Sequence, residues 1–274
     1  MSVDSIIFPH LHMAFQQVGS HASVFGISIA YYGIIISLGM VIAGAFVLYD
    51  ANLHGKSQDD YLDVMIYGLI FGVIGARLYY VFFSWDYYKD NLLSIFNLRQ
   101  GGLAIYGGII AGIIAAIIVC KIKKLDFLEV ADSVSFGLII GQFFGRFGNF
   151  FNREAFGGYT DNLFAMLLPL SSVRSMDDVT LQMMEHAKTI DGVTFISVHP
   201  TFLYESLWSL GIFLILFFYR RIKKFRGEIF FMYLMLYGLG RFWMEHLRTD
   251  QLKILHTNIP VSQVVAAVAI LISG

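Results

Sequence analysis

Long apolar stretches separated by short polar segments occupy most of the chain. A helix that spans a membrane needs roughly 20 mostly apolar residues. Seven stretches approach or exceed that length: 25–48, 62–83, 102–120, 127–150, 202–219, 228–247 and 258–273. They lack the alternation of apolar and polar residues that is typical of a membrane β-strand. The pattern therefore predicts an all-α, polytopic membrane protein with about seven transmembrane helices.

The longest polar stretch, 151–200, contains Gly157-Gly158, Pro169 and several Ser and Asp residues. A short helix is expected around Met176 to His186. We interpret the stretch as a small cap within a single integral membrane domain, 1–274, and not as a second domain. Neither an internal repeat nor an inverted pair of broken helices is visible, so the sequence does not suggest a two-fold transporter.

Two basic runs predict the orientation of the spans. One run, at 121–124, lies between the third and fourth spans, and the other, at 220–226, lies between the fifth and sixth. Loops rich in Lys and Arg stay on the cytoplasmic side of a membrane. With seven spans, both runs fall on that side. The N-terminus and the 151–200 cap are then expected outside, and the C-terminus in the cytoplasm.

Composition narrows the class further. Of the 274 residues, 57% are hydrophobic and 14% are charged, whereas about 25% are charged in ordinary soluble domains. A soluble enzyme surface and a charge-rich, nucleic-acid-binding chain are both excluded. The single cysteine, Cys120, excludes a disulfide framework and a site of several cysteines within one chain. We expect no metal site and no cofactor.

The charged residues within the predicted spans need an explanation, because a charge near the bilayer centre costs at least about 2.5 kcal/mol. With a rise of about 1.5 Å per helical residue, polar side chains gather in one layer in the outer third of the bilayer. The layer contains Arg77, Arg146, Arg241, Glu205, Glu245, Asn149, Tyr32, Tyr106 and Tyr204, and Tyr237 shares a helix face with Arg241. Such groups normally face the bundle interior and pair with one another.

Pairing within one helix explains only part of this layer. Arg241 and Glu245 are spaced for an ion pair across one turn. Arg146 and Arg77 have no acid one turn away, and an anionic ligand would supply a partner for Arg146. The alternatives are structural. Arg77 could form a packing ion pair or extend toward the interface, Arg241 and Glu245 could be a structural pair, and the tyrosines could be interfacial anchors.

At these residues the sequence resembles the prolipoprotein diacylglyceryl transferase family. The segment Gly145 to Gly157, GRFGNFFNREAFG, is similar to the family's signature. Shorter pieces of the family pattern follow in order over nearly the whole chain: Tyr31-Tyr32-Gly33, Gly75 to Val81, Gly101-Gly102-Leu103, Tyr106-Gly107-Gly108, His199-Pro200-Thr201, Leu203-Tyr204-Glu205, and Tyr237-Gly238 with Arg241 and Glu245.

The resemblance implies a substrate pair and a location. The family transfers the diacylglyceryl group of phosphatidylglycerol to the thiol of the lipobox cysteine in a prolipoprotein signal peptide. The products are a thioether and glycerol phosphate. The reaction takes place at the outer face of the bacterial inner membrane, which agrees with the depth of the polar layer. A different class of function stays open, a membrane protein that binds or transports anionic phospholipid without covalent chemistry.

The resemblance also implies roles for individual residues. Arg146 and Arg241 would bind the phosphoglycerol headgroup, because arginine is permanently charged and grips phosphate with two parallel donors. Asn149 and Tyr32 would add hydrogen bonds, and Glu154, Glu245 and Tyr237 would orient the arginines or the glycerol hydroxyls. The remaining expected substrate-binding residues are Gly157, Arg77, His199 and Glu205.

Two positions depart from the family pattern. Tyr106 stands where many members carry a histidine that is a proposed base. A tyrosine, with a pKa near 10, is a poorer base at neutral pH. We include Tyr106 with Arg146 and Arg241 as a candidate catalytic residue, and Glu154, Glu205, His199 or water are alternative bases. Phe202 replaces a frequent glutamine and therefore has no polar role.

Overall fold

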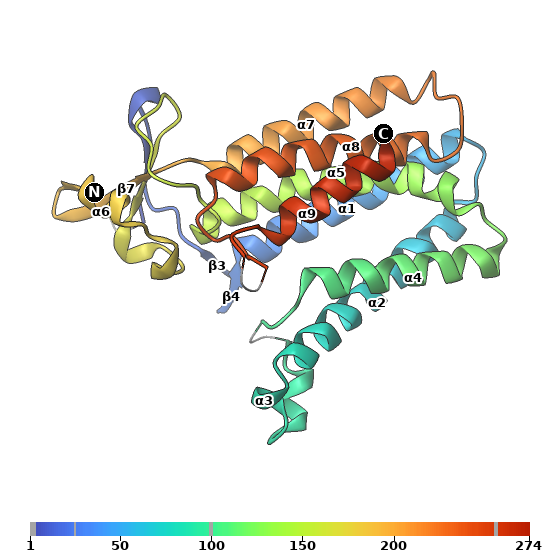
Figure 1. Cartoon of the computed structure of the whole chain (residues 1–274), viewed down its shortest axis with the longest axis horizontal. Coiled ribbons are helices and arrows are strands. Elements are labelled where there is room, and N and C mark those ends of the chain that lie inside the picture. The colour runs from blue at the N-terminus through green and yellow to red at the C-terminus, as the bar shows by residue number, and fades with distance from the viewer. Residues whose placement is uncertain (1–3, 25, 99–100, 255–256) are drawn as a thin grey trace. The chain divides into compact units, whose positions relative to one another are not determined.

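The computed structural model describes residues 4–24, 26–98, 101–254 and 257–274. Each of the seven expected spans coincides with a helix (Figure 1). These helices are α1 (Tyr31–Leu53), α2 (Gln58–Phe83), α4 (Ile105–Lys123), α5 (Phe127–Asn152), α7 (Thr201–Tyr219), α8 (Glu228–Met244) and α9 (Val261–Ser273). The first five are long and apolar enough to cross a membrane. The predicted class, a mostly helical polytopic membrane protein, is confirmed. Helix α8 has 17 residues and α9 has 13, so the count of seven spans stays a prediction.

The start of the first helix was predicted too early in the sequence. Its predicted first residue, Phe25, lies outside the described residues, and Ile27–Ala30 forms strand β4, which pairs antiparallel with β3 (His21–Val24). Helix α1 begins only at Tyr31. A short apolar run does not distinguish a strand from a buried helix by its hydrophobicity. The hairpin is therefore a correction to the interpretation of 25–30 as helical.

The chain forms two compact units. The first contains Met1–Ala43 and Ser135–Gly274, and the second contains Gly44–Val134. The boundaries fall inside α1 and α5. In the first unit α8 packs against α7 and α9, and these helices and α5 run alongside one another in Figure 1.

A five-stranded antiparallel sheet lies at one end of the first unit, and we call it, together with α6 (Leu181–Glu185), the cap. Its strand order is β2-β1-β5-β7-β6. The strands are β1 (Ile6–Phe8), β2 (Met13–Phe15), β5 (Met166–Pro169), β6 (Lys188–Ile190) and β7 (Val193–Val198). The sequence prediction placed the cap in 151–200 alone and did not predict that the N-terminal strands complete its sheet. The short helix expected there is α6, preceded by a 3₁₀ turn at Met176–Asp178.

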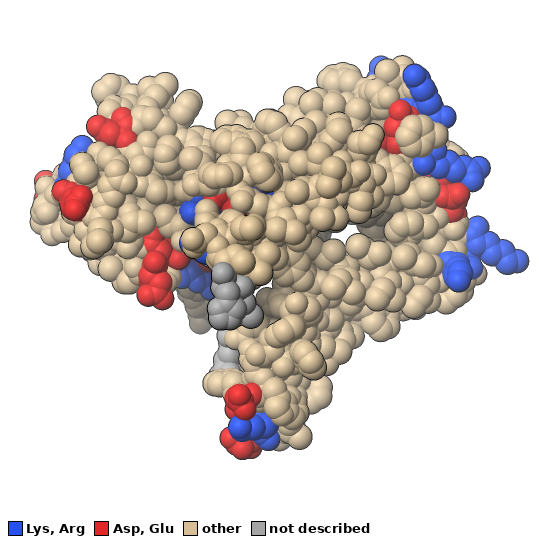
Figure 2. Space-filling model, in the orientation of Figure 1, with Lys and Arg blue, Asp and Glu red and all other residues tan. Residues whose placement is uncertain are grey.

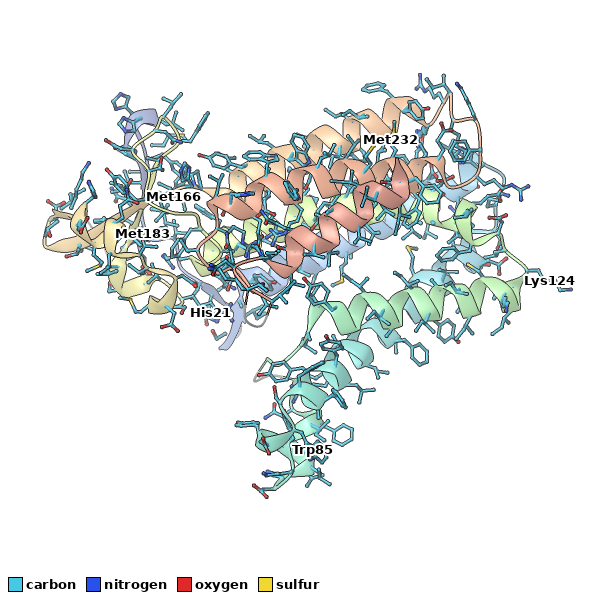
Figure 3. The ribbon with its side chains drawn as sticks, in the orientation of Figure 1. His21, Trp85, Lys124, Met166, Met183 and Met232 are labelled. Carbon is cyan, nitrogen blue, oxygen red and sulfur yellow. The ribbon has the colours of Figure 1, made fainter. Side chains whose placement is uncertain are left out.

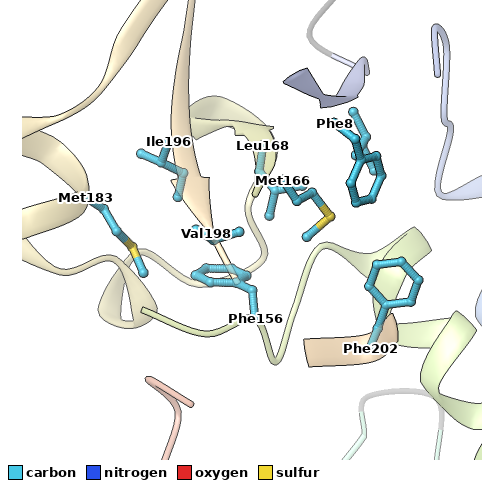
Figure 4. Packing of buried hydrophobic residues seen from close by; sticks show 9 residues of the cluster. Phe8, Phe156, Met166, Leu168, Met183, Ile196, Val198 and Phe202 are labelled. Atoms are coloured by element: carbon cyan, nitrogen blue, oxygen red, sulfur yellow. The ribbon is translucent and has the colours of Figure 1, made fainter. Parts of the chain in front are cut away.

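The cap has its own apolar core, which also includes residues that lead into the helices. Figure 4 shows side chains from the sheet, such as Met166 and Ile196, facing Phe156 and Phe202. Phe202 belongs to the first turn of α7, and its ring lies 4.8 Å from that of Phe150 near the end of α5. This packing fixes the ends of α5 and α7 against the sheet. The expectation that Phe202 has no polar role agrees with its place in this core.

In the second unit α2 and α4 pack closely through glycines. Gly68, Gly72 and Gly75 face the backbone of Gly112, Gly108 and Gly107, respectively. A Cβ atom at Gly75 would lie 2.7 Å from the Gly107 carbonyl oxygen, closer than real contacts allow. Small residues permit such backbone approach between membrane helices, so these glycines serve helix packing.

Helix surfaces are mostly uncharged, as the tan areas in Figure 2 show. Large apolar residues are exposed along α2 and α4, for example Leu69 and Ile110, as expected for helices in contact with lipid. Basic residues gather where helices end. In Figure 3, Lys124 stands directly after α4, where it closes the helix in a left-handed conformation.

Candidate active site

Helices α5 and α7 bring together two charges that the sequence left unmatched. The Arg146 Nη2 atom on α5 lies 2.6 Å from Glu205 Oε2 on α7. The sequence shows no acid one turn from Arg146, and the structure supplies a protein partner where an anionic ligand was considered. Its partner comes from another helix, so a search for acids one turn away could not find it. Helix packing, not sequence spacing, creates the pair.

Two further arginines approach the same carboxylate. Arg241 Nη1 on α8 lies 3.6 Å from Glu205 Oε2, and Arg248 Nη1 lies 3.5 Å from Glu205 Oε1. The predicted pair across one helical turn is confirmed, with Arg241 Nη2 on α8 at 2.8 Å from Oε2 of Glu245, the residue directly after α8. Arg248 has no role in the predictions from the sequence. It also forms a bidentate ion pair with Asp250. We call Arg146, Glu205, Arg241, Glu245 and Arg248 the arginine cluster.

The carboxylates of the arginine cluster are buried, its arginines are half-buried, and the cluster is not fully hydrogen-bonded. The Glu205 and Glu245 side chains are 8% and 3% exposed. Among the described residues, neither Glu205 Oε1 nor Arg241 Nη1 has a hydrogen-bond partner, although each lies in an ion pair of 3.5–3.6 Å. Buried polar atoms are normally satisfied. Both a donor and an acceptor are thus left over for a ligand.

A small cavity adjoins the arginine cluster. It is lined by Gln142, Arg146, Glu205, Trp208, Ser209, Tyr237, Gly240, Arg241 and Met244. Two arginines and one glutamate give this lining a formal charge of +1. Electrostatic interactions are strong where water is excluded, so the cavity suits a ligand with one negative charge and an apolar part.

The signature segment continues the polar network at the end of α5. Arg146 donates to Asn149 Oδ1 at 3.4 Å, and Asn149 Nδ2 donates to Glu154 Oε1 at 2.9 Å. Glu154 also pairs with Arg174 from the cap, a partner that the sequence did not indicate. The expected grouping of Arg146, Asn149 and Glu154 is therefore present. A second small cavity is lined partly by Asn149 and Glu154.

Tyr32 lies against this segment. A Cβ atom at Gly148 would lie 2.7 Å from the Tyr32 ring, so the glycine lets the first turn of α1 approach α5 closely. The Tyr32 ring therefore lies against Gly148, the residue that directly precedes Asn149 in α5.

Gly157 joins three segments of the site. Its N–H donates to the His199 carbonyl at 3.0 Å, and the N–H of Gly158 donates to the Leu247 carbonyl at 2.8 Å. His199 Nδ1 lies 3.4 Å from the Tyr204 hydroxyl. Burial lowers the pKa of His199 from its ordinary value of 6.5, so its imidazole is neutral at pH 7.

Arg153 is a structural residue that the sequence did not single out. It is buried, takes a positive φ of 50°, and donates to the Val18 carbonyl and to Asp4. Burial lowers the pKa of its guanidinium group. Arg153 therefore ties the N-terminal segment to the signature segment. The sequence offers one signal for this role, namely an arginine between Asn152 and Glu154 in the signature segment.

Arg77 and Tyr106 belong to the second unit. Arg77 is buried, and its guanidinium group donates to five backbone carbonyls, those of Ser94, Ile95, Asn97, Gly101 and Gly102. A guanidinium group has five N–H donors, so these bonds can use all of them. Its cationic carbon also lies 5.1 Å from the centre of the Tyr88 ring. Tyr106 is half-buried in the first turn of α4.

In the described residues no group of three His, Cys, Asp or Glu side chains is arranged to hold a metal ion. The site is instead a buried cluster of arginines and carboxylates beside a cavity, within a helical bundle that has membrane-spanning helices. The molecule is thus of the class of polytopic membrane proteins, with arginines and carboxylates lining a pocket.

Comparisons with known proteins all point to one family. The family model described as prolipoprotein diacylglyceryl transferase matches residues 21–274. A phosphatidylglycerol–prolipoprotein diacylglyceryl transferase of Clostridioides difficile is 43% identical over 230 residues, which are 84% of this chain and 83% of the relative. The protein of that name from Finegoldia magna is 43% identical over 92% of this chain and 91% of its own. One from Clostridium botulinum is 38% identical over 90% and 91%.

The chain belongs to the prolipoprotein diacylglyceryl transferase family and is a transferase. The alternative of a lipid carrier without covalent chemistry is therefore not retained.

Proposed function

We propose that this transferase moves the diacylglyceryl group of phosphatidylglycerol to the thiol of a prolipoprotein's lipobox cysteine. Family membership supports the two substrates, which appear in the names of the relatives. The observation that carries the assignment to this chain is the cavity beside the arginine cluster. Its lining has a formal charge of +1, which one phosphodiester would neutralise.

In the proposed reaction the cysteine thiolate attacks the glycerol carbon that bears the phosphate ester. The new bond is S–C, and the bond that breaks joins this carbon to the ester oxygen. The bonding electrons leave with glycerol phosphate, and the thiol proton passes to a base. Negative charge grows on the leaving oxygen, so fixed positive charge beside it lowers the barrier. Arg146 and Arg241, both lining the cavity, are the proposed catalytic residues.

Glu205 acts in this proposal as a positioning residue. It touches three guanidinium groups, so in this proposal it serves as their counter-ion and not as the base. Asn149, Glu154, Tyr32, Tyr237 and Glu245 complete the proposed headgroup site.

The residues left as candidate bases are Tyr106, Glu154 and His199, along with water. His199 is neutral at pH 7 because burial lowers its pKa, so it can accept a proton. Arg77 is not retained for the headgroup, because its donors are used by the 94–102 backbone. We propose that it stabilises that segment.

We propose that the protein lies in the bacterial inner membrane with the cap outside and the basic runs in the cytoplasm. The positive-inside rule supports this orientation. The arginine cluster lies near the ends of α5 and α8 and the start of α7, close to the cap in the chain, which supports a site toward the outer leaflet.

The test is a transfer assay with purified protein, phosphatidylglycerol and a lipobox peptide, followed by mass measurement of the peptide. The unaltered chain should add one diacylglyceryl group, and a Cys→Ser peptide should gain none. Arg146→Ala should lower kcat by about 10²- to 10³-fold, as when one donor to a developing oxyanion is removed. Arg221→Ala, an exposed arginine outside the site, is the matched control. Absence of adduct with the unaltered chain would overturn the proposal, and an unaltered rate in Arg146→Ala would remove that residue from the site.

A further inference from the structure

Gln142 lines the same cavity, one turn before Arg146 on α5. Its Nε2 donates to the Tyr233 hydroxyl at 2.8 Å. Its Oε1 is buried and has no hydrogen-bond partner within the described part of the chain. Leaving a buried acceptor without a donor costs about 1–3 kcal/mol. Neither the proposed mechanism nor the signature uses this side chain.

Tyr233 fixes the orientation of that amide. The Tyr233 side chain is buried, and its ring stacks on the Tyr237 ring at 5.8 Å between centres. Tyr237 itself lines the cavity. With Nε2 held by Tyr233, the carbonyl oxygen is the atom of Gln142 left for a ligand.

The chemistry around Gln142 selects the kind of donor that fits. Phosphate oxygens are acceptors, so they belong at the arginines and not at a carbonyl. An ammonium group would donate to the carbonyl, but it would face Arg146 and Arg241, which both line the cavity, and like charges repel strongly in a low dielectric. A neutral hydroxyl can donate a hydrogen bond to the Gln142 carbonyl without bringing a positive charge.

The spacing along α5 fits one molecule that carries both groups. Gln142 and Arg146 are four residues apart on one helix face, about 6 Å along the axis. A glycerol esterified to phosphate places hydroxyls at a comparable distance from its anionic oxygens. We propose that Gln142 accepts a hydrogen bond from a hydroxyl of the lipid's glycerol headgroup and is therefore a specificity-determining residue. Tyr233 is its positioning residue. This inference rests on the proposed function.

The test compares two lipids with the same acyl chains, phosphatidylglycerol and phosphatidylpropanol. Both carry one negative charge, and only the first has headgroup hydroxyls. A site built to bond a hydroxyl discriminates against an analogue without it. In Gln142→Met, which is similar in size and has no amide, kcat/KM for phosphatidylglycerol should fall about tenfold, the value of one buried hydrogen bond. For phosphatidylpropanol it should stay within about twofold, so the preference between the lipids collapses.

Two further variants separate this role from a structural one. Tyr233→Phe keeps Gln142 but releases its amide, and should reduce the same preference. Gln263→Met removes an exposed amide on α9 that donates to the Phe242 carbonyl at 3.1 Å, and should leave the preference unchanged. If Gln142→Met does not fold, Tyr233→Phe decides the matter.

Equal losses with both lipids in Gln142→Met and Tyr233→Phe, or an unchanged preference in both, would overturn the role of Gln142 while the proposed function stands. No thioether from the unaltered chain with phosphatidylglycerol would overturn the proposed function and this inference together.

Discussion

Glu205 is a buried carboxylate shared by guanidinium groups from α5, α8 and the segment after α8. Removing a charge from water is expensive, and only well-placed opposite charges offset that cost. Here the three arginines repel one another without the carboxylate between them. The residue therefore sets the positions of the groups that we propose to bind phosphate.

Glu205→Gln keeps the shape of the side chain and removes its charge. Breaking a buried charge network from one side costs about 3–5 kcal/mol, so we expect a lower thermal midpoint and at least a tenfold loss of transfer. Thermal unfolding and the transfer assay measure the two effects. Transfer at the unaltered rate would contradict a positioning role for Glu205.

At the residue scale the sequence predicts which side chains matter better than it predicts how they pair. Charges inside apolar helices indicated Arg146, Arg241, Glu205 and Glu245, because lipid penalises each of them. Only the pair of Arg241 and Glu245 followed from spacing. The partners of Arg146 depend on which helices pack together, and periodicity along one helix contains no such information.

The junction at Gly157 is the element on which the site depends most. A Cβ atom there would lie 2.7 Å from both His199 Cβ and the Leu247 carbonyl oxygen. The signature loop, the end of β7 and the 3₁₀ helix Glu245–Leu247 thus meet at a point with no room for a side chain. Glu245 belongs to the third of these segments, so its position depends on the junction.

Gly157→Ala should separate these segments. Overpacking of this kind costs about 1–3 kcal/mol, and we expect a lower thermal midpoint together with reduced transfer. Gly158→Ala is the matched control, because a Cβ atom at Gly158 meets nothing within 4 Å. Equal effects of the two substitutions would show that the close approach at Gly157 is unimportant.

At the element scale the helices other than α1 were predicted to within about four residues, α1 begins six residues later than predicted, and the strands were not predicted. Hydrophobic length identifies a spanning helix directly. The strand Ile6–Phe8 is only 3 residues long, and its partner Met166–Pro169 lies far along the chain. Pairing at such a separation depends on tertiary packing, which a local pattern does not report.

Over the whole molecule the charges divide by location. Several of the buried or half-buried ones form the arginine cluster, and basic side chains gather at helix ends, where Lys123 pairs with Asp60 and Asp63. We propose that the same residue types serve two purposes, since basic residues in loops set membrane orientation and the arginine cluster binds an anion.

The orientation can be tested with single cysteines. In a Cys120→Ala background, Ser171→Cys in the cap should react with a membrane-impermeant thiol reagent in intact cells. Arg221→Cys, between α7 and α8, should react only after the cells are opened. Both positions are exposed, so access to the reagent is the variable measured. The reverse labelling pattern would contradict the proposed topology.

The carboxylates among the arginines also bear on product release. A phosphodiester carries one negative charge, whereas a phosphate monoester carries about 1.5–2 at pH 7. The departing glycerol phosphate is therefore attracted to Arg146 and Arg241 more strongly than the lipid that produced it. Glu205 and Glu245 already touch these guanidinium groups and compete with the product for them. The carboxylates that hold the arginines in place would thus also keep the enzyme from being trapped by what it makes.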